Sequence, residues 1–147
     1  MGMPWLDSLN LGLEEFDDDH HHLFDLLIEL NSAVETGDAS CIRTLLAELH
    51  AGTIEHLQEE EALMARIRYP ALADHLASHD NMRLCLHELQ CIAARGRLDR
   101  VADALAAYST AYFRGVLRHD GLLAAYLNGA ATVPVRLGGG MMSVAGR

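Results

Sequence analysis

Two pairs of side chains are spaced for metal binding. His56 and Glu60 are four residues apart, and so are His75 and His79. Residues four apart lie on one face of an α-helix, so each pair can direct two ligand atoms at a common point. Either pair alone also fits a solvated pair on a surface helix. The apolar neighbours of both pairs favour burial, however, and burying an imidazole without a partner costs about 2 kcal/mol or more.

Two further residues extend the candidate site. His20 begins an apolar face that Leu23 continues, and Asp17 lies one turn earlier, where it can hold the second nitrogen of the His20 ring. Asp120 lies beside Leu123 near the end of the chain's last apolar pattern. We therefore expect His20 and Asp120 to enter the same interior as the two pairs.

The combined ligand set indicates the metal. It contains four imidazoles, two carboxylates and no thiolate: His20, His56, Glu60, His75, His79 and Asp120. Nitrogen and oxygen donors of this kind suit iron, and suit zinc, copper or manganese less well. Six ligands are too many for one tetrahedral zinc ion. The set fits two metal ions bridged by Glu60, Asp120 and an oxide or hydroxide, which together offset the charge of the ions.

Four amphipathic helices are predicted to position these residues. Apolar residues recur at steps of three and four over residues 17–36, 40–69, 70–95 and 99–127. Gly37 and Gly129 follow two of these runs, Pro70 separates the second from the third, and Ser40 can cap the second helix. Such helices bury their apolar faces most simply in an up-down-up-down four-helix bundle, which makes the fold class all-α.

The chain is predicted to contain one domain with two appendages. Residues 17–128 form the bundle, and residues 1–16 form an N-terminal arm whose Trp5, Leu9, Leu11 and Leu13 pack on it. Residues 129–147 have no hydrophobic period and contain three consecutive glycines. We expect this segment to be a flexible C-terminal tail that needs no strand.

The composition excludes several classes of function. The chain has 147 residues and a formal net charge of −10, which disfavours nucleic acid and anionic membrane surfaces as partners. No apolar run is long enough to cross a bilayer and no signal segment is recognisable, so we expect a cytoplasmic protein. Its three cysteines form no CxxC pair. We expect the oligomeric state to be a monomer or a weak homo-oligomer.

The motifs also match a known family in content and order. They are Trp5 followed by Gly12, FDxxH from Phe16, HLxxEExxM from His56, YPxxxxHxxxH from Tyr69, and DxxLxxYL from Asp120. Over residues 5–127 the chain thus resembles the bacterial hemerythrins, four-helix bundles that hold a carboxylate-bridged diiron centre and bind O2 reversibly. Ferritin-like diiron bundles are less similar, because they use Glu-x-x-His spacing and more carboxylates.

The resemblance implies a role for each candidate ligand. His20 and His56 would bind one iron, His75 and His79 the other, and Glu60 and Asp120 would bridge the two. Leu23, Phe24, Leu27 and Leu57 are candidate walls of a pocket for O2 or a small anion. Glu59 and Glu61 flank Glu60; we expect a solvated acidic run, with support of a neighbouring ligand by one of them as the alternative.

One ligand of the family pattern is missing. The family carries a histidine five residues before the bridging aspartate, and this chain has Gly115 there, with Ala111 in place of the tryptophan that commonly lies four residues earlier. His119 is a candidate substitute, and otherwise it hydrogen-bonds a carboxylate or leaves a coordination position open.

Three functions follow from these alternatives. The first is a non-haem diiron protein for O2 storage, delivery or sensing, with a ligand set altered at Gly115. The second is a diiron oxidase or peroxidase that uses the extra open position. The third is a partner-binding or metal-sequestering bundle. Because the first two share one site, the sequence alone leaves enzymatic activity undecided.

Overall fold

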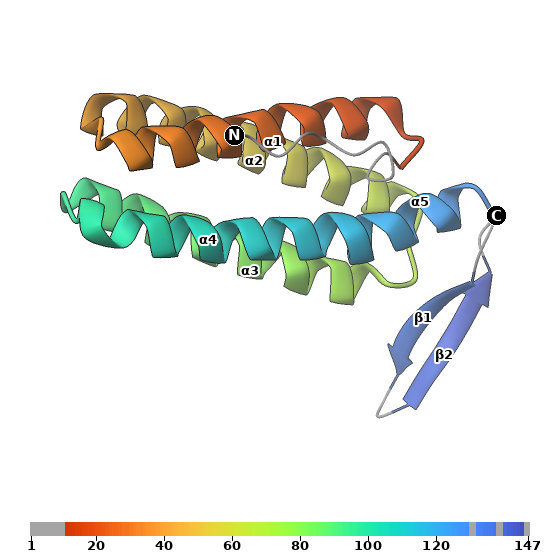
Figure 1. Cartoon of the computed structure of the whole chain (residues 1–147). Helices are drawn as coiled ribbons and strands as arrows, with labels where there is room; N and C mark the ends of the chain where they lie inside the picture. The colour runs from red at the N-terminus through yellow and green to blue at the C-terminus, as the bar shows by residue number, and fades with distance from the viewer. Residues whose placement is uncertain (1–10, 130–131, 138–139, 146–147) are drawn as a thin grey trace.

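The computed structural model describes residues 11–129, 132–137 and 140–145. Its main elements are four long helical segments, α1 (Glu14–Thr36), α2 (Ala39–Arg66), α3 (Leu72–Ala94) and α4 (Leu98–Arg114). The π-helical segment η2 (Gly115–Asp120) and the short helix α5 (Gly121–Leu127) continue α4 along the same line (Figure 1). The predicted all-α four-helix bundle is confirmed.

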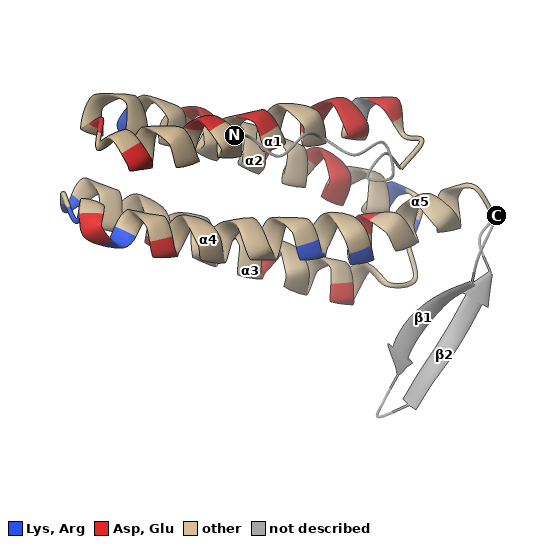
Figure 2. Ribbon diagram, viewed as in Figure 1, with Lys and Arg blue, Asp and Glu red and all other residues tan. Residues whose placement is uncertain are grey.

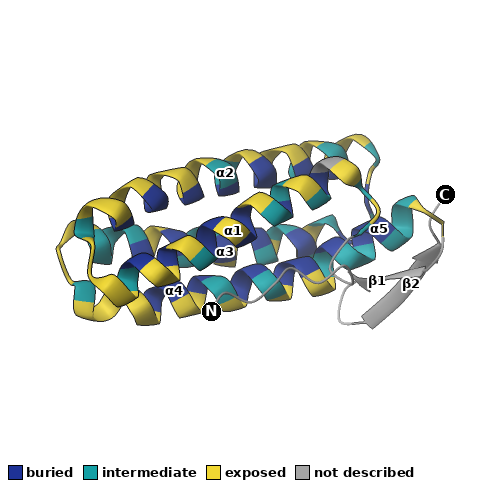
Figure 3. Ribbon diagram, turned by 45° about the horizontal axis from the view of Figure 1, so that its top comes forward, coloured by how far each residue is buried: buried dark blue, intermediate teal, exposed yellow. Residues whose placement is uncertain are grey.

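Neighbouring helices run in opposite directions. α1 packs on α2, α2 on α3, α3 on α4 and α4 back on α1, so the four surround one core. Buried residues face the axis of the bundle along every helix, and exposed residues cover the outside (Figure 3). Acidic side chains are spread over α1 and α2, and α1 contains no Lys or Arg (Figure 2).

The interior contains two apolar clusters. The larger fills most of the bundle and includes the fully buried Leu30, Leu49 and Leu89. The smaller lies around Met64 and Leu123, near the start of α1 and α3. The six candidate ligands lie in the same interior and, with Thr53, are its buried polar side chains among the described residues.

The ends of the helices differ from the predictions in detail. Gly37 ends α1 with a positive φ of 70°, as predicted for a glycine at this position. The cap of α2 is Asp38 rather than Ser40, because its carboxylate accepts a hydrogen bond from the N–H of Cys41. α1 begins at Glu14, within the predicted arm; Trp5 and Leu9 lie outside the described residues.

A hairpin follows the bundle where we expected no strand. β1 (Thr132–Leu137) pairs antiparallel with β2 (Gly140–Ala145), and the hairpin lies beyond the end of α5 (Figure 1). The sequence contains Val133, Val135 and Val144, whose β-branched side chains favour extended backbone. That residues 129–147 serve as a flexible tail, and that the domain spans 17–128, stay predictions.

Candidate metal centre

Six buried side chains meet inside the bundle, toward the end at which α1 and α3 begin. His20 comes from α1, His56 and Glu60 from α2, His75 and His79 from α3, and Asp120 from the last position of η2. Each residue is at most 5% exposed. Their ligand atoms form two groups, and within each group they lie within 4.8 Å of one another. Group one is His20, His56, Glu60 and Asp120, and group two is Glu60, His75, His79 and Asp120.

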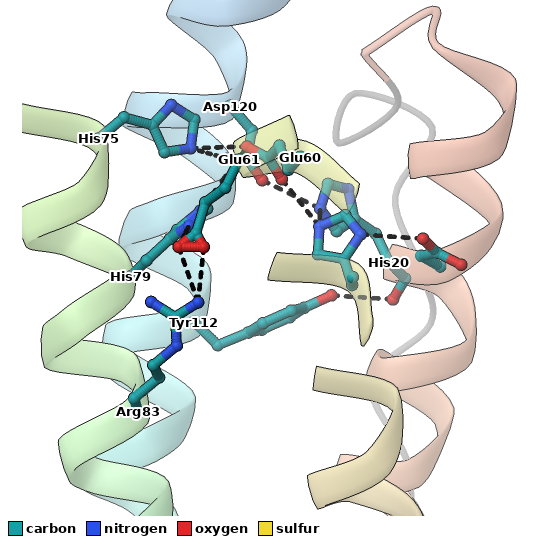
Figure 4. Close-up of polar contacts among 10 residues, drawn as sticks. His20, Glu60, Glu61, His75, His79, Arg83, Tyr112 and Asp120 are labelled. Atoms are coloured by element: carbon teal, nitrogen blue, oxygen red, sulfur yellow. Dashed lines mark hydrogen bonds and ion pairs between the residues drawn. The ribbon is translucent and has the colours of Figure 1, made fainter. Parts of the chain in front are cut away.

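The two carboxylates join the groups. Glu60 directs Oε2 at His56 Nε2, 3.0 Å away, and Oε1 at His75 Nε2, 2.6 Å away. Asp120 directs Oδ2 at His20 Nε2, 3.0 Å away, and Oδ1 at His75 Nε2, 2.9 Å away. Each carboxylate therefore offers one oxygen to each group (Figure 4). This division of its oxygens suits a carboxylate that bridges two metal ions with one oxygen on each.

The polar atoms at the centre are poorly satisfied without a cation. Both oxygens of Glu60 and Nε2 of His75 are buried and make no hydrogen bond of acceptable geometry. His20 Nε2 and His56 Nε2 face each other at 3.1 Å, and both also approach carboxylate oxygens. Buried polar atoms normally have partners, and cations placed between these atoms would supply them. The residues present thus fit a pair of metal ions.

Asp19 fixes the orientation of one candidate ligand. Its Oδ2 lies 2.9 Å from His56 Nδ1, so that nitrogen donates its hydrogen and Nε2 is left to face the centre. A carboxylate in this position also makes the imidazole a stronger metal ligand. We had expected Asp17 to play this role for His20. Asp17 instead accepts hydrogen bonds from the N–H groups of Leu11 and Gly12 at the start of α1.

We expect Asp19→Asn to weaken metal binding by about 10- to 100-fold, because the amide keeps the hydrogen bond but not the negative charge. Anaerobic titration of the stripped protein with Fe(II) against a competing chelator measures this. Asp18→Asn is the matched control, since Asp18 is an exposed neighbour with the same charge. Equal affinities in the two variants would show that Asp19 has no influence on the site.

A second carboxylate approaches group two from outside. Glu61 Oε1 lies 3.7 Å from His79 Nδ1, and Arg83 binds both oxygens of Glu61 at 2.7 and 2.6 Å (Figure 4). Of the two accounts given for Glu61, the contact with His79 favours support of a ligand over a purely solvated side chain, and Glu61 also links α2 to α3. Arg83 was not recognised from the sequence, because nothing local relates it to a residue 22 positions earlier.

The close contacts also change the proton affinities of the metal-free site. Burial disfavours the charged form of His56, but its contacts with Asp19 and Glu60 outweigh burial and raise its pKa to about 10. Burial also disfavours the charged form of His75. Its contacts with Asp120 and Glu60 outweigh burial and raise its pKa to about 9. For Glu60, burial favours the neutral acid, but the neighbouring imidazoles hold its pKa well below the ordinary value.

The stability of the metal-free protein should consequently fall in alkaline solution. A histidine whose pKa is raised on folding stabilises the fold fully below its unfolded pKa of 6.5 and loses this effect as the pH rises through 9 to 10. We expect the melting temperature of the stripped protein to drop by several degrees between pH 6 and pH 10. The iron-loaded protein should show a weaker or opposite trend over the neutral range, because metal binding requires neutral imidazoles. A pH-independent melting temperature of the stripped protein would contradict the charge pairing described here.

The fourth helix changes its geometry at the site. We predicted one continuous α-helix over residues 99–127, but η2 interrupts it from Gly115 to Asp120. A π-turn joins residues five apart, so it brings positions 115 and 120 toward the same face. Our placement of His119 between these positions assumed α-helical geometry. In the structure His119 belongs to neither group, and its ring packs beside that of His75 with centroids 5.7 Å apart. Ligation by His119 stays a prediction that this arrangement does not favour.

A small cavity adjoins the two groups. Its volume is about 10 Å³ in terms of the space open to the centre of a water molecule, which is room for about one molecule of that size. It is lined by His20, Leu23, Thr53, His56, Leu57, His79, Met82, Tyr112, Val116 and Asp120. Of the four predicted pocket walls, Leu23 and Leu57 line it, whereas Phe24 and Leu27 are buried elsewhere in the interior.

The polar side chains of the cavity wall are already paired. The Tyr112 hydroxyl donates to the backbone oxygen of His20 at 2.9 Å, and the Thr53 hydroxyl pairs with that of Tyr108 at 2.7 Å. Burial raises the pKa of the Tyr108 phenol and that of the Tyr112 phenol, so both remain protonated near neutral pH. Apart from the candidate ligands, the cavity is therefore an apolar space with its hydroxyl groups engaged.

Comparison with known proteins places this arrangement in context. Residues 11–127 match the family model described as the hemerythrin HHE cation binding domain. Bacteriohemerythrin of Stenotrophomonas maltophilia (strain R551-3) is 26% identical over 115 residues, which are 77% of this chain and 75% of that protein. Bacteriohemerythrin of Pseudomonas aeruginosa (strain LESB58) is 28% identical over 78 residues, 53% of this chain and 51% of that protein. The matched range of the family model includes all six buried side chains.

Proposed function

The chain belongs to the hemerythrin family, and from this premise we propose that it binds O2 reversibly at two iron ions held by the six buried side chains. Membership of the family implies non-haem iron binding. The observation that carries the proposal is the division of the carboxylate oxygens of Glu60 and Asp120 between two groups that each contain two imidazoles. This supports His20 and His56 as ligands of one ion and His75 and His79 as ligands of the other.

The protein supplies the surroundings that reversible binding needs. When bound, a pair of iron ions would supply the two electrons and the coordination position that O2 needs; an oxide or hydroxide bridge, besides the carboxylates of Glu60 and Asp120, is part of the proposal. Leu23, Leu57 and Val116 line the cavity beside the centre with buried apolar side chains, which disfavours water there. Asp19 holds His56 in one tautomer. The Tyr112 hydroxyl donates its hydrogen bond to the backbone carbonyl of His20 and not into the cavity. With these groups engaged, few protons are available in the cavity. Reduced O2 is then less readily protonated and lost from the centre.

The ligand set differs from the family pattern at one position, and this favours a second candidate function. Gly115 supplies no ligand, and His119 belongs to neither group. An iron with an extra exchangeable position can react with a substrate or with peroxide, which is the property of a diiron oxidase or peroxidase. Storage, delivery and sensing of O2 are alternatives within the first function. We also propose that the protein acts in the cytoplasm as a monomer or weak homo-oligomer. Among the described residues, no helix has the length and hydropathy that crossing a bilayer demands.

One experiment separates the two functions. Protein purified without oxygen is analysed for iron, exposed to air while the visible spectrum is recorded, and then deoxygenated again. A coloured form that appears and disappears over repeated cycles supports reversible O2 binding. Colour that decays in one cycle, with consumption of added hydrogen peroxide, supports the enzyme. Protein that takes up no iron under any condition contradicts both.

A further inference from the structure

The space beside Gly115 is occupied by a methionine. A Cβ atom added to Gly115 would lie 2.9 Å from the terminal methyl carbon of Met82 and 3.3 Å from the hydroxyl of Ser78. Met82 is 5% exposed and belongs to the larger core cluster. Gly115 thus makes room for Met82, and a larger side chain at position 115 would require Met82 to move.

Met82 also lies next to group two. It follows His79 by three residues on α3, so both side chains project from one face of that helix. Met82, His79 and Asp120 line the same cavity. Since η2 turns position 115 toward the face of Asp120, the space that Met82 fills is the space from which a side chain at 115 would approach group two.

Group two has no third imidazole, because position 115 is a glycine and Met82 fills the space beside it. It contains His75 and His79 besides the two shared carboxylates, which matches the composition of group one. A histidine at 115 would occupy a coordination position permanently. Methionine is uncharged, has three rotatable side-chain bonds and adapts its shape to irregular spaces, so it can fill a space and leave it again.

We propose that Met82 is a displaceable apolar plug over a second ligand-exchange position at group two, which accepts a small monovalent anion when the plug moves. The proposal rests on the proposed function, because the anion is bound by the iron of group two. The second position takes only a small ligand, because its space is the one that the Met82 side chain vacates beside a cavity that by itself holds about one water-sized molecule. Met82 makes its binding weaker than that of the first anion, because the side chain must leave its place.

The spatial part of the proposal is tested in the metal-free protein. Gly115→His should lower the melting temperature by about 5 °C, because the imidazole competes with Met82 for one space. Adding Met82→Ala should restore most of this loss. Met64→Ala is the matched control, as Met64 is a fully buried methionine of the smaller core cluster. Strictly additive effects in the Met82 pair, as expected for the Met64 pair, would overturn the proposal.

The functional part is tested by titrating the air-oxidised, iron-loaded protein with azide. Wild type should bind two azide ions per chain, the second at least about tenfold more weakly than the first. Met82→Ala should strengthen the second step about tenfold, Met82→Leu should leave it as weak as in wild type or weaker because leucine is stiffer, and Gly115→His with Met82→Ala should abolish it. A single azide with one affinity in every variant would overturn the proposal.

Two other outcomes have distinct meanings. If Met82→Leu behaves like Met82→Ala, the sulfur atom itself binds iron and Met82 is not an apolar plug. If the protein binds no iron, the proposed function fails and the anion position fails with it. In that case the melting temperatures of the metal-free variants still decide whether Met82 and residue 115 compete for one space.

Discussion

Glu60→Gln should abolish the binding of a pair of iron ions. Glu60 belongs to both groups and directs a different oxygen at each, so its loss affects both metal positions at once. A glutamine has one carbonyl oxygen and no negative charge, and it cannot bridge two cations in this way. Because loss of a residue that only orients a ligand costs about 10- to 100-fold, we expect the affinity for the pair to fall by more than about 100-fold. Elemental analysis of protein reconstituted with Fe(II) without oxygen measures this.

Glu59→Gln is the matched control for this substitution. Glu59 precedes Glu60 on α2, carries the same charge and is exposed. The Glu59→Gln substitution should leave the iron content at two ions per chain. In the metal-free protein, Glu60→Gln should also lower the pKa of His56 from about 10, since Glu60 is one of the groups that raise it. A Glu60→Gln protein that still holds two iron ions would exclude Glu60 as a bridge.

Removal of the iron should lower the melting temperature by more than about 10 °C. A ligand that binds only the folded state at a thousand times its Kd stabilises that state by about 4 kcal/mol, and here two ions contribute. For a chain of this size each kcal/mol corresponds to about 2–4 °C. The buried imidazoles and carboxylates would also lose the cations that satisfy them. Differential scanning calorimetry of loaded and chelator-stripped protein measures the difference.

Readdition of metal provides the control for this experiment. Fe(II) added without oxygen should restore the original melting temperature, whereas Mg²⁺ should not, because the imidazole-rich set suits a transition metal. If the stripped protein melts at the same temperature as the loaded protein, the metal contributes nothing to the folded state and the proposed site is not coupled to the fold.

The candidate ligands could be predicted from the sequence because their signal is local. Spacings of four residues place His56 with Glu60, and His75 with His79, on shared helix faces whatever the rest of the fold does. Helix boundaries were predictable to within a few residues for a similar reason, since glycine and proline act on the backbone where they occur. The structure brings the four helices together so that these faces meet, which the spacing alone does not specify.

The surroundings of the ligands depend on contacts between distant parts of the chain. Asp19, and not Asp17, contacts a candidate ligand. That ligand is His56 on α2, and not His20, which lies on the same helix as Asp19. The pairing of Glu61 with Arg83 links α2 and α3 in the same way. Three consecutive aspartates at 17–19 indicate acidity near His20, but only the packing of α1 on α2 selects the one that contacts an imidazole.

The geometry of the fourth helix was the largest departure from the prediction. A regular α-helix separates positions 115 and 120 by more than a third of a turn, and η2 reduces this separation. Within this segment His119 belongs to neither group, and the missing side chain of Gly115 leaves its space to Met82. A missing side chain is visible in the sequence, but the residue from another helix that fills its space is not.

The most direct test of the account is a crystal structure of the protein reconstituted with Fe(II), with an anomalous difference map recorded at the iron edge. We expect two iron peaks per chain, one contacted by His20 and His56 and the other by His75 and His79, with Glu60 and Asp120 contacting both. A single peak, or iron bound only by exposed side chains outside the two groups, would contradict it.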